Sequence, residues 1–319
     1  MFILAILLLL PSCKKESTVE LPAGDSWITF SGQGMSAVSI YSIIQDANGN
    51  IWAGSYGNGL YRYSDGEWYN YNTSNSGLLD DYVLCLKEDP TGKLWIGAFD
   101  GITLLNGSTW FTQATSAPVL SVEYYTYDHS IFFGLAGDGF INYYNGSYES
   151  YTFNDSTMNY INSIYSDSQN YLWFGTKNGI YRMNSSYKLT TMRESNGLIN
   201  NYVKCFFEDN RGRIWIGTFG GSVMQWYQNS TLHNAPYMSG YDLNFNLAIS
   251  QDMFGNLWFG MISSGALKYN GSIMDPVTTN DGLCDNTILS IFRDNQNRMW
   301  FGSYRGGISL LQQAMPRNY

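Results

Sequence analysis

Residues 209–218 read Asp-Asn-Arg-Gly-Arg-Ile-Trp-Ile-Gly-Thr, a polar turn followed at once by an apolar strand. The stretch contains a tripeptide, an aromatic residue, any residue and Gly, that recurs in seven copies at a nearly constant spacing. Successive copies are 43, 37, 41, 42, 43 and 42 residues apart. A period of this length indicates a repeat architecture in which each copy is one supersecondary unit. The copies begin at Trp52, Trp95, Phe132, Trp173, Trp215, Trp258 and Trp300.

Each copy has the same order of turns and apolar segments. An apolar stretch such as residues 288–292 leads to an Asp that opens a turn, and the aromatic tripeptide follows. A Gly-rich bend, a third strand such as residues 59–63 and an outer strand such as residues 67–71 complete the unit. Pairs such as Asp65-Gly66 between the last two strands tolerate the positive φ of a type I′ hairpin turn. The turn-opening residues are Asp46, Asp89, Asp167, Asp209, Asp252 and Asp294, with Asp128 as a degenerate member in a shortened hairpin.

Four short antiparallel strands in about 42 residues are the size of one β-propeller blade. We therefore predict an all-β fold, a seven-bladed β-propeller, over residues 25–319. The seventh copy ends after a third strand at residues 307–311, and residues 27–30, Trp-Ile-Thr-Phe, resemble the outer strand at residues 68–71. We expect the N-terminal strand to complete the last blade and close the ring, because closure removes an exposed strand edge.

The composition narrows the class of protein. The chain of 319 residues is 17% aromatic and only 13% charged, with a formal net charge of −9. Disordered chains are poor in aromatic residues, so a large folded core is expected. An acidic surface repels phosphate, which argues against nucleic acid as a partner.

The amino terminus carries an apolar run at residues 2–10, too short to span a bilayer and typical of a signal peptide. Residues 10–13, Leu-Pro-Ser-Cys, resemble a bacterial lipobox, which predicts a signal peptide over residues 1–12, lipidation of Cys13 and a polar tether over residues 13–24. Lys14 is not the Asp that retains lipoproteins in the inner membrane, so we expect an outer-membrane anchor as the only membrane contact. The alternative is an ordinary secretory signal with an incidental Cys.

One unit shows the repeat pattern most fully, with Asn196-Gly-Leu198, Asp209, Gly212, residues 214–218 and Gly220-Gly221. This pattern resembles the two-component regulator propeller repeat. In that family, tandem propellers form the periplasmic sensor region of hybrid histidine kinases, many of which respond to glycan breakdown products. The resemblance implies a sensor-type propeller, here expected to be a stand-alone lipoprotein without a kinase.

Loops carry binding in a repeat fold because the scaffold fixes them while their sequence varies. The position two residues after each tripeptide Gly is expected to lie on one face, around the central channel. Aromatic residues there would stack on sugar rings, and neighbouring polar residues would supply hydrogen bonds. We predict a site for a neutral or weakly charged oligosaccharide, or a peptide; the alternative is that these side chains only cover the blade tops. The predicted ligand-binding residues are Tyr56, Phe99, Asp100, Asp138, Lys177, Phe219, Tyr304 and Arg305.

No motif in the sequence predicts catalysis, a metal site or a cofactor. The two histidines, His129 and His233, fall in the turn of the third unit and in a loop of the fifth, and are not at metal-ligand spacing. Asp80 and Asp81 are adjacent carboxylates, but neighbouring residues of a strand or loop seldom point to one place, so they are not expected to act as a catalytic pair. All ten Trp are expected to be packing residues, and reduced thiols are expected for the remaining cysteines, Cys85, Cys205 and Cys284.

These features favour a non-enzymatic envelope lipoprotein that binds a glycan or peptide. Two alternatives stay open: a platform that docks a membrane or secreted protein partner, and a propeller lyase or hydrolase.

Overall fold

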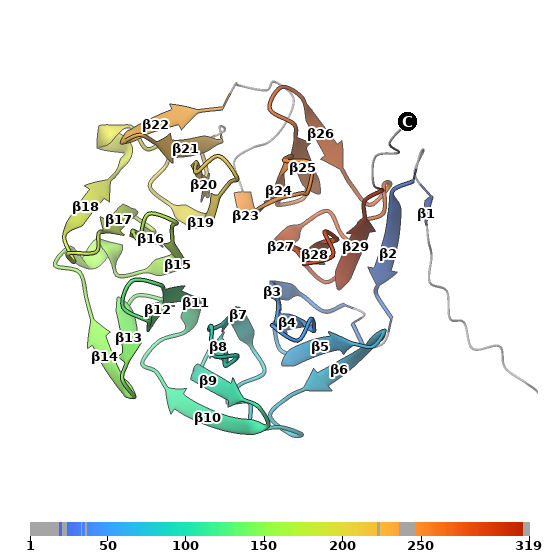
Figure 1. The fold of residues 1–319 in the computed structure, drawn as a ribbon, viewed down its shortest axis with the longest axis horizontal. Coiled ribbons are helices and arrows are strands. Elements are labelled where there is room, and N and C mark those ends of the chain that lie inside the picture. Colours follow the sequence, from blue (N-terminus) through green and yellow to red (C-terminus); the bar gives the residue numbers. More distant parts are fainter. Residues whose placement is uncertain are drawn as a thin grey trace, which may run out of the picture.

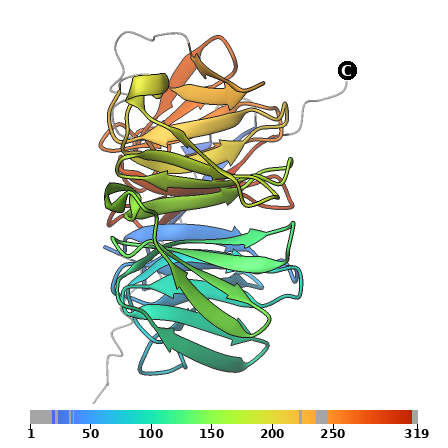
Figure 2. The same cartoon turned by 90° about the vertical axis from the view of Figure 1, so that its left-hand side faces the viewer.

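The computed structural model describes residues 19–20, 24–32, 34–35, 37–221, 224–235 and 246–314. Seven antiparallel sheets are arranged in a ring, and each sheet extends from an inner strand near the centre to an outer strand at the rim (Figure 1). Seen from the side, the strands run across the ring from one face to the other (Figure 2). The predicted seven-bladed propeller is confirmed. The predicted signal peptide and Cys13 lie outside the described residues.

The blades follow one another along the chain. Blade 1 has β3 (Ile40–Gln45), β4 (Ile51–Ser55), β5 (Leu60–Ser64) and β6 (Glu67–Tyr71); blade 2 has β7 (Val83–Glu88), β8 (Leu94–Ala98), β9 (Gly101–Asn106) and β10 (Thr109–Ala114). Blade 3 has β11 (Val119–Tyr125), β12 (Ser130–Leu135), β13 (Phe140–Tyr144) and β14 (Ser147–Tyr151); blade 4 has β15 (Ile161–Ser166), β16 (Leu172–Thr176), β17 (Gly179–Met183) and β18 (Leu189–Met192).

The second half of the ring repeats this order. Blade 5 has β19 (Val203–Glu208), β20 (Ile214–Thr218), β21 (Gln225–Gln228) and β22 (Thr231–Asn234); blade 6 has β23 (Asn246–Gln251), β24 (Leu257–Met261), β25 (Ala266–Tyr269) and β26 (Met274–Val277). Blade 7 has β27 (Ile288–Arg293), β28 (Met299–Ser303), β29 (Ile308–Gln312) and, from the other end of the chain, β2 (Ser26–Phe30). In the described part of the chain the helices are two three-residue 3₁₀ turns, η1 (Ser156–Met158) and η2 (Glu194–Asn196), and no helix is long and apolar enough to cross a bilayer.

The ring closes as predicted. Strand β2 pairs antiparallel with β29, with Ser26 opposite Gln312 and Phe30 opposite Ile308. Trp27 is buried at this junction, with its ring 5.3 Å from that of Phe301. The structure adds one feature to the expected tether: β1 (Val19–Glu20) pairs with β2 as a fifth strand of blade 7.

The Gly of the repeated tripeptide lets neighbouring blades approach closely. A Cβ on Gly97 of blade 2 would lie 2.3 Å from Cys85 Sγ in the same blade and 2.7 Å from a methyl group of Val119 in blade 3. A Cβ on Gly302 of blade 7 would lie 2.7 Å from a methyl group of Ile40 in blade 1, so the same contact seals the ring. The residue opposite this Gly in the first strand is therefore small; in blade 3 it is Ser121.

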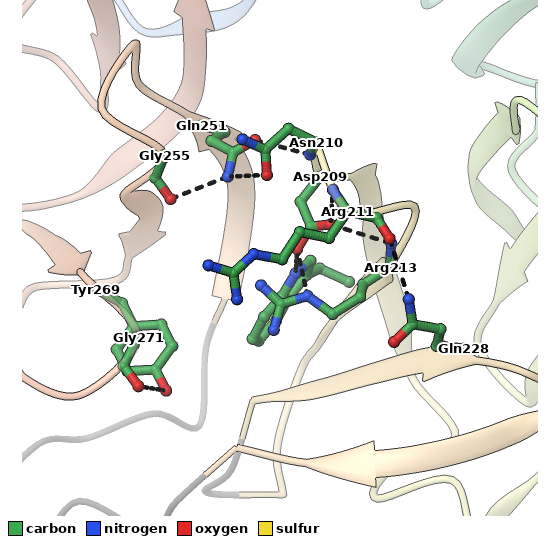
Figure 3. A network of polar contacts seen from close by, with 10 residues as sticks. Asp209, Asn210, Arg211, Arg213, Gln228, Gln251, Gly255, Tyr269 and Gly271 are labelled. Atoms are coloured by element: carbon green, nitrogen blue, oxygen red, sulfur yellow. Dashed lines mark hydrogen bonds and ion pairs between the residues drawn. The ribbon is translucent and has the colours of Figure 1, made fainter.

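The repeated Asp joins each turn to the buried Trp. In blade 5, Asp209 Oδ1 accepts the backbone N–H groups of Arg211 and Arg213, and Oδ2 accepts Trp215 Nε1 at 2.8 Å (Figure 3). The same Asp to Trp hydrogen bond occurs in the six blades that have both residues, at 2.7–3.0 Å. Blade 3 has Phe132 in place of Trp. Its Asp128 instead accepts hydrogen bonds from the backbone N–H of Ser130 and from the Tyr187 hydroxyl.

The turns also connect neighbouring blades. Gln251 of blade 6 accepts the backbone N–H of Asn210 in blade 5 at 2.9 Å (Figure 3). Glu88 accepts from Ala47 across the interface of blades 1 and 2, at 2.8 Å. Each of these turns follows the first strand of its blade, and the predicted ligand loops lie at the other end of that strand. One face of the ring therefore carries the turns that connect the blades, and the other face carries the loops.

Candidate ligand site at the channel mouth

Each blade points one extra side chain into the central channel. The pairing of the first and second strands shifts by one residue near the start of the first strand in all seven blades. Such a β-bulge redirects a side chain. The seven bulged residues all line one cavity of about 440 Å³ on the axis of the ring. They are Tyr41, Leu84, Leu120, Asn162, Lys204, Leu247 and Leu289.

The predicted loop positions lie at one end of this channel. The backbone N–H two residues after the tripeptide Gly donates to the residue just before the first strand of the same blade: Tyr56 to Ser39 at 3.0 Å, and Tyr304 to Thr287 at 2.9 Å. Four further blades repeat the bond: Phe99 to Tyr82, Ala136 to Pro118, Lys177 to Tyr160 and Phe219 to Tyr202. The equivalent residue of blade 6, Ile262, lines the channel itself. We call this end the channel mouth.

One side of the mouth is an arc of aromatic side chains on blades 7, 1 and 2. Within it Tyr41 stacks on Tyr56 with 5.4 Å between ring centroids, Tyr56 meets Tyr82 edge-on at 4.7 Å, and Tyr82 lies 6.1 Å from Phe99. Burial, together with the neighbouring Tyr56 and Tyr304 hydroxyls, raises the pKa of Tyr41. The aromatic arc is Tyr304, Tyr41, Tyr56, Tyr82 and Phe99, each of them 38–46% exposed.

The other side of the mouth, on blades 4 and 5, is cationic. Lys177 Nζ lies 3.3 Å from the centroid of the Tyr160 ring, and Lys204 Nζ lies 5.6 Å from that of Tyr202. Lys204 Nζ also donates to Asn162 Oδ1 at 3.4 Å. Burial lowers the pKa of Lys204, and the charge of Lys177 lowers it further. We call Lys177 and Lys204 the lysine pair.

The remaining predicted site residues are exposed around the mouth. Asp100 donates its backbone N–H to Asp80 Oδ2 at 3.0 Å, and Arg305 lies with its guanidinium carbon 5.2 Å from the Tyr304 ring. Asp138 is exposed beside the bend of blade 3, and Phe219 lies 5.2 Å from Tyr202. The structure therefore brings the predicted residues to one face, with Phe219 and Lys177 on a different sector from Tyr56, Phe99 and Tyr304.

Residues outside the mouth have structural roles. Asp80 Oδ1 caps Tyr82 and Asp81 Oδ1 accepts the N–H of Thr73, so the two carboxylates serve different loops. His129 contacts the Tyr124 hydroxyl in the first hairpin of blade 3. His233 lies on the outer strand β22, where the sequence predicted a loop, and stacks on Trp226.

Three cysteines lie in the part of the chain that the structure describes. Cys85, Cys205 and Cys284 are free thiols there, as predicted. Burial raises the pKa of the Cys205 thiol to about 12, which keeps it protonated. Within that part of the chain no group of three or more His, Cys, Asp or Glu side chains is arranged to hold a metal ion.

The sequence analysis missed the bulged residues and the aromatic residues before the first strand. The bulged residue is the second of the first strand in every blade. It stands 13 residues before the tripeptide Gly in six blades and 14 before it in blade 3, so aligning the units with one gap would have shown a column of Leu interrupted by Tyr41, Asn162 and Lys204. The column two positions before the bulge contains Tyr82, Tyr160 and Tyr202. Their contribution depends on the bulge, which periodicity alone does not reveal.

Fold and channel together define a seven-bladed β-propeller with an open, side-chain-lined mouth. Five segments, residues 34–57, 77–100, 156–178, 197–220 and 282–305, match the sequence model of the family described as Two component regulator propeller. Five of the seven blades thus contain the two-component regulator propeller repeat, as the resemblance indicated. The unmatched blades are 3, which lacks the Trp, and 6. No curated protein matches the chain by sequence.

Solved structures share the fold at low identity. A catalytically inactive virginiamycin B lyase from Staphylococcus aureus, with quinupristin, is 16% identical, with a TM-score of 0.76 over 91% of this chain and 100% of that chain. The extracellular domain of a putative hybrid two component system from B. thetaiotaomicron is 22% identical, with a TM-score of 0.75 over 91% of this chain and 40% of that chain. A second such domain from the same organism is 20% identical, with a TM-score of 0.76 over 92% and 44%.

Proposed function

We propose that this protein is a non-enzymatic, sensor-type binding propeller of the cell envelope whose channel mouth recognises a glycan. The observation that carries the proposal is the aromatic arc. All six Trp of the repeated tripeptide are buried in the blades, whereas the five rings of the arc remain well exposed beside an open channel. The scaffold does not require an aromatic residue at the position of Tyr56, Phe99 and Tyr304, since other blades have Ala136 or Ile262 there.

The geometry suits a saccharide better than a flat apolar partner. Tyrosine presents an apolar ring face and a hydroxyl that forms hydrogen bonds, which matches the alternating C–H and O–H surface of a sugar. The aromatic arc joins side chains from three blades, and the rigid ring holds them in place. A peptide with an aromatic or Pro-rich segment is the second ligand class that this surface fits.

The test is isothermal titration of the purified protein against a panel of oligosaccharides and peptides. We expect a saccharide to bind, and the double variant Tyr56→Ala with Tyr304→Ala to weaken it by at least about tenfold, as expected for the loss of stacking anchors worth over 1 kcal/mol. Phe111→Ala is the matched control, because Phe111 is an aromatic residue on the outer strand β10 that is even more exposed than Tyr56 and Tyr304. Peptide binding alone, or equal binding by both variants, would overturn the proposal.

The envelope location is a separate part of the proposal, and it rests on Cys13 and the apolar run before it. Metabolic labelling with palmitate should label the protein, and Cys13→Ser should lose the label while Cys284→Ser keeps it. An unlabelled wild-type protein would contradict lipid anchoring without bearing on the glycan site.

A further inference from the structure

The lysine pair brings two positive charges to one side of the channel mouth. Lys177 follows strand β16 of blade 4, and Lys204 is the bulged residue of β19 in blade 5. Tyr202 lies next to both, with its ring centroid 5.9 Å from Lys177 Nζ and 5.6 Å from Lys204 Nζ. Like charges repel, and the influence of Lys177 on the pKa of Lys204 shows that the two charges interact.

No acidic side chain of the described ranges compensates these charges. The ion pairs found there are Lys87 with Glu123, Arg193 with Asp155, Arg213 with Asp209 and Arg298 with Asp294. The polar partner of Lys204 is the neutral Asn162, whose amide is fixed by donating to the Val203 carbonyl at 2.8 Å. In a chain with a net charge of −9, the lysine pair is a local concentration of positive charge, on other blades of the mouth than Asp100 and Asp138.

A lysine in this position costs stability in the ligand-free protein. Taking an ammonium group partly out of water is unfavourable unless an anion pairs with it. Four of the other six blades have Leu at the same bulge, so the fold itself accepts an apolar side chain there. The charge of Lys204 is therefore explained by a ligand better than by the scaffold.

We infer that the lysine pair binds an anionic group of the ligand, a carboxylate or sulfate on a sugar ring, while the aromatic arc stacks on a neighbouring part of the same molecule. The inference rests on the proposed glycan function and changes the expected ligand from a neutral or weakly charged oligosaccharide to an acidic one. The channel of about 440 Å³ admits one sugar residue between the two sides of the mouth.

The test uses oligosaccharides in matched charged and neutral forms. Oligogalacturonates and glucuronate-containing oligosaccharides are compared with their methyl esters, and sulfated disaccharides with their desulfated forms, by isothermal titration at low and high salt. We expect the charged form to bind about 10- to 100-fold more tightly, as for hydrogen bonds to charged groups, and salt to reduce this preference. Whether the uronate or the sulfated arm responds identifies the anion.

Two lysine variants locate the effect. Lys204→Met keeps the length of the side chain and should remove the preference for the charged form, measured as the ratio of the Kd values of the neutral and charged forms. Lys188→Met is the control, because Lys188 carries the same charge on the exposed hairpin between β17 and β18. It should leave the preference unchanged.

Each contrary result has a distinct meaning. Equal binding of charged and neutral forms, still lost in the Tyr56→Ala and Tyr304→Ala double variant, would overturn this inference and leave the proposed function standing. A preference that survives in Lys204→Met would show that the anion binds elsewhere. If no form of any saccharide binds, the proposed function fails and this inference fails with it.

Discussion

The hydrogen bond between the turn Asp and the buried Trp is the most exacting test of how the blades are stabilised. In blade 7, the Asp294 side chain is fully buried. Its Oδ1 accepts the backbone N–H groups of Gln296 and Arg298, and its Oδ2 accepts Arg298 Nε at 2.5 Å and Trp300 Nε1 at 2.8 Å. Asp294→Asn keeps the shape of this side chain and replaces one acceptor oxygen by an NH₂ donor.

The expected loss of stability in Asp294→Asn follows from the N–H donors that are left without an acceptor. If the amide oxygen keeps the two backbone bonds, its NH₂ group faces two buried N–H donors. A buried donor without a partner costs about 1–3 kcal/mol, and Arg298 also loses its ion pair, so we expect a loss of about 2–5 kcal/mol in the free energy of unfolding. Urea unfolding measures it as a shift in the midpoint at constant slope.

Asp128→Asn is the matched control, because it opens the equivalent turn of blade 3 beside Phe132, where no indole N–H is present. Its Tyr187 partner is exposed and regains water, so the expected loss is at most about 1 kcal/mol. Trp300→Phe completes a double-mutant cycle with Asp294→Asn, and the double variant should lose less stability than the sum of the two single losses. Equal losses for Asp294→Asn and Asp128→Asn, or zero coupling, would refute the reasoning.

Three further predictions concern packing and charge. Gly97→Ala should lower the free energy of unfolding by about 1–3 kcal/mol through overpacking against Cys85 and Val119, whereas Gly32→Ala, which meets no atom within 4 Å, should change it little. Although burial opposes it, hydrogen bonds from Thr91 and Trp95 hold the pKa of Asp89 below its usual value. The ionised carboxylate therefore stabilises the fold above its pKa in the unfolded chain, about 3.9, and this stabilisation is lost as the pH falls through its pKa in the folded protein. Asp89→Asn should accordingly show a shallower loss of stability than the wild type between about pH 5 and pH 2 in urea unfolding. Burial lowers the pKa of Lys204, so its charge opposes folding at any pH below the pKa in the folded protein, and this penalty is relieved as the pH rises. Lys204→Met should therefore raise the melting temperature of the ligand-free protein at neutral pH. A lower melting temperature would contradict an uncompensated charge.

The repeat made most of the fold predictable. The spacing of the tripeptide and the Asp-opened turns gave the number of blades, and the strand-like residues 27–30 gave the closure. These inferences succeed because each blade must bury the same apolar faces against its neighbours, so the same residue types return at the same positions.

The site was predictable only in part. The loop position after each tripeptide identified Tyr56, Phe99 and Tyr304, since it follows a fixed offset from the Gly. Lys204 and Tyr41 were missed because a one-residue bulge turns them towards the channel. A bulge depends on how two strands pair, which strict alternation along one strand does not encode.

The pairing of β2 with β29 has a consequence for biogenesis. Ser26 and Gln312 are 286 positions apart, so the ribosome releases the first strand long before its partner exists. Throughout synthesis, β2 lacks its partner β29, and the apolar face of blade 1 that packs against blade 7 is uncovered. Chains that stall or are cleaved before β29 cannot close, and their exposed strand edges make them targets for aggregation or proteolysis. Closure of the ring thus requires the strands from both ends of the propeller to be present.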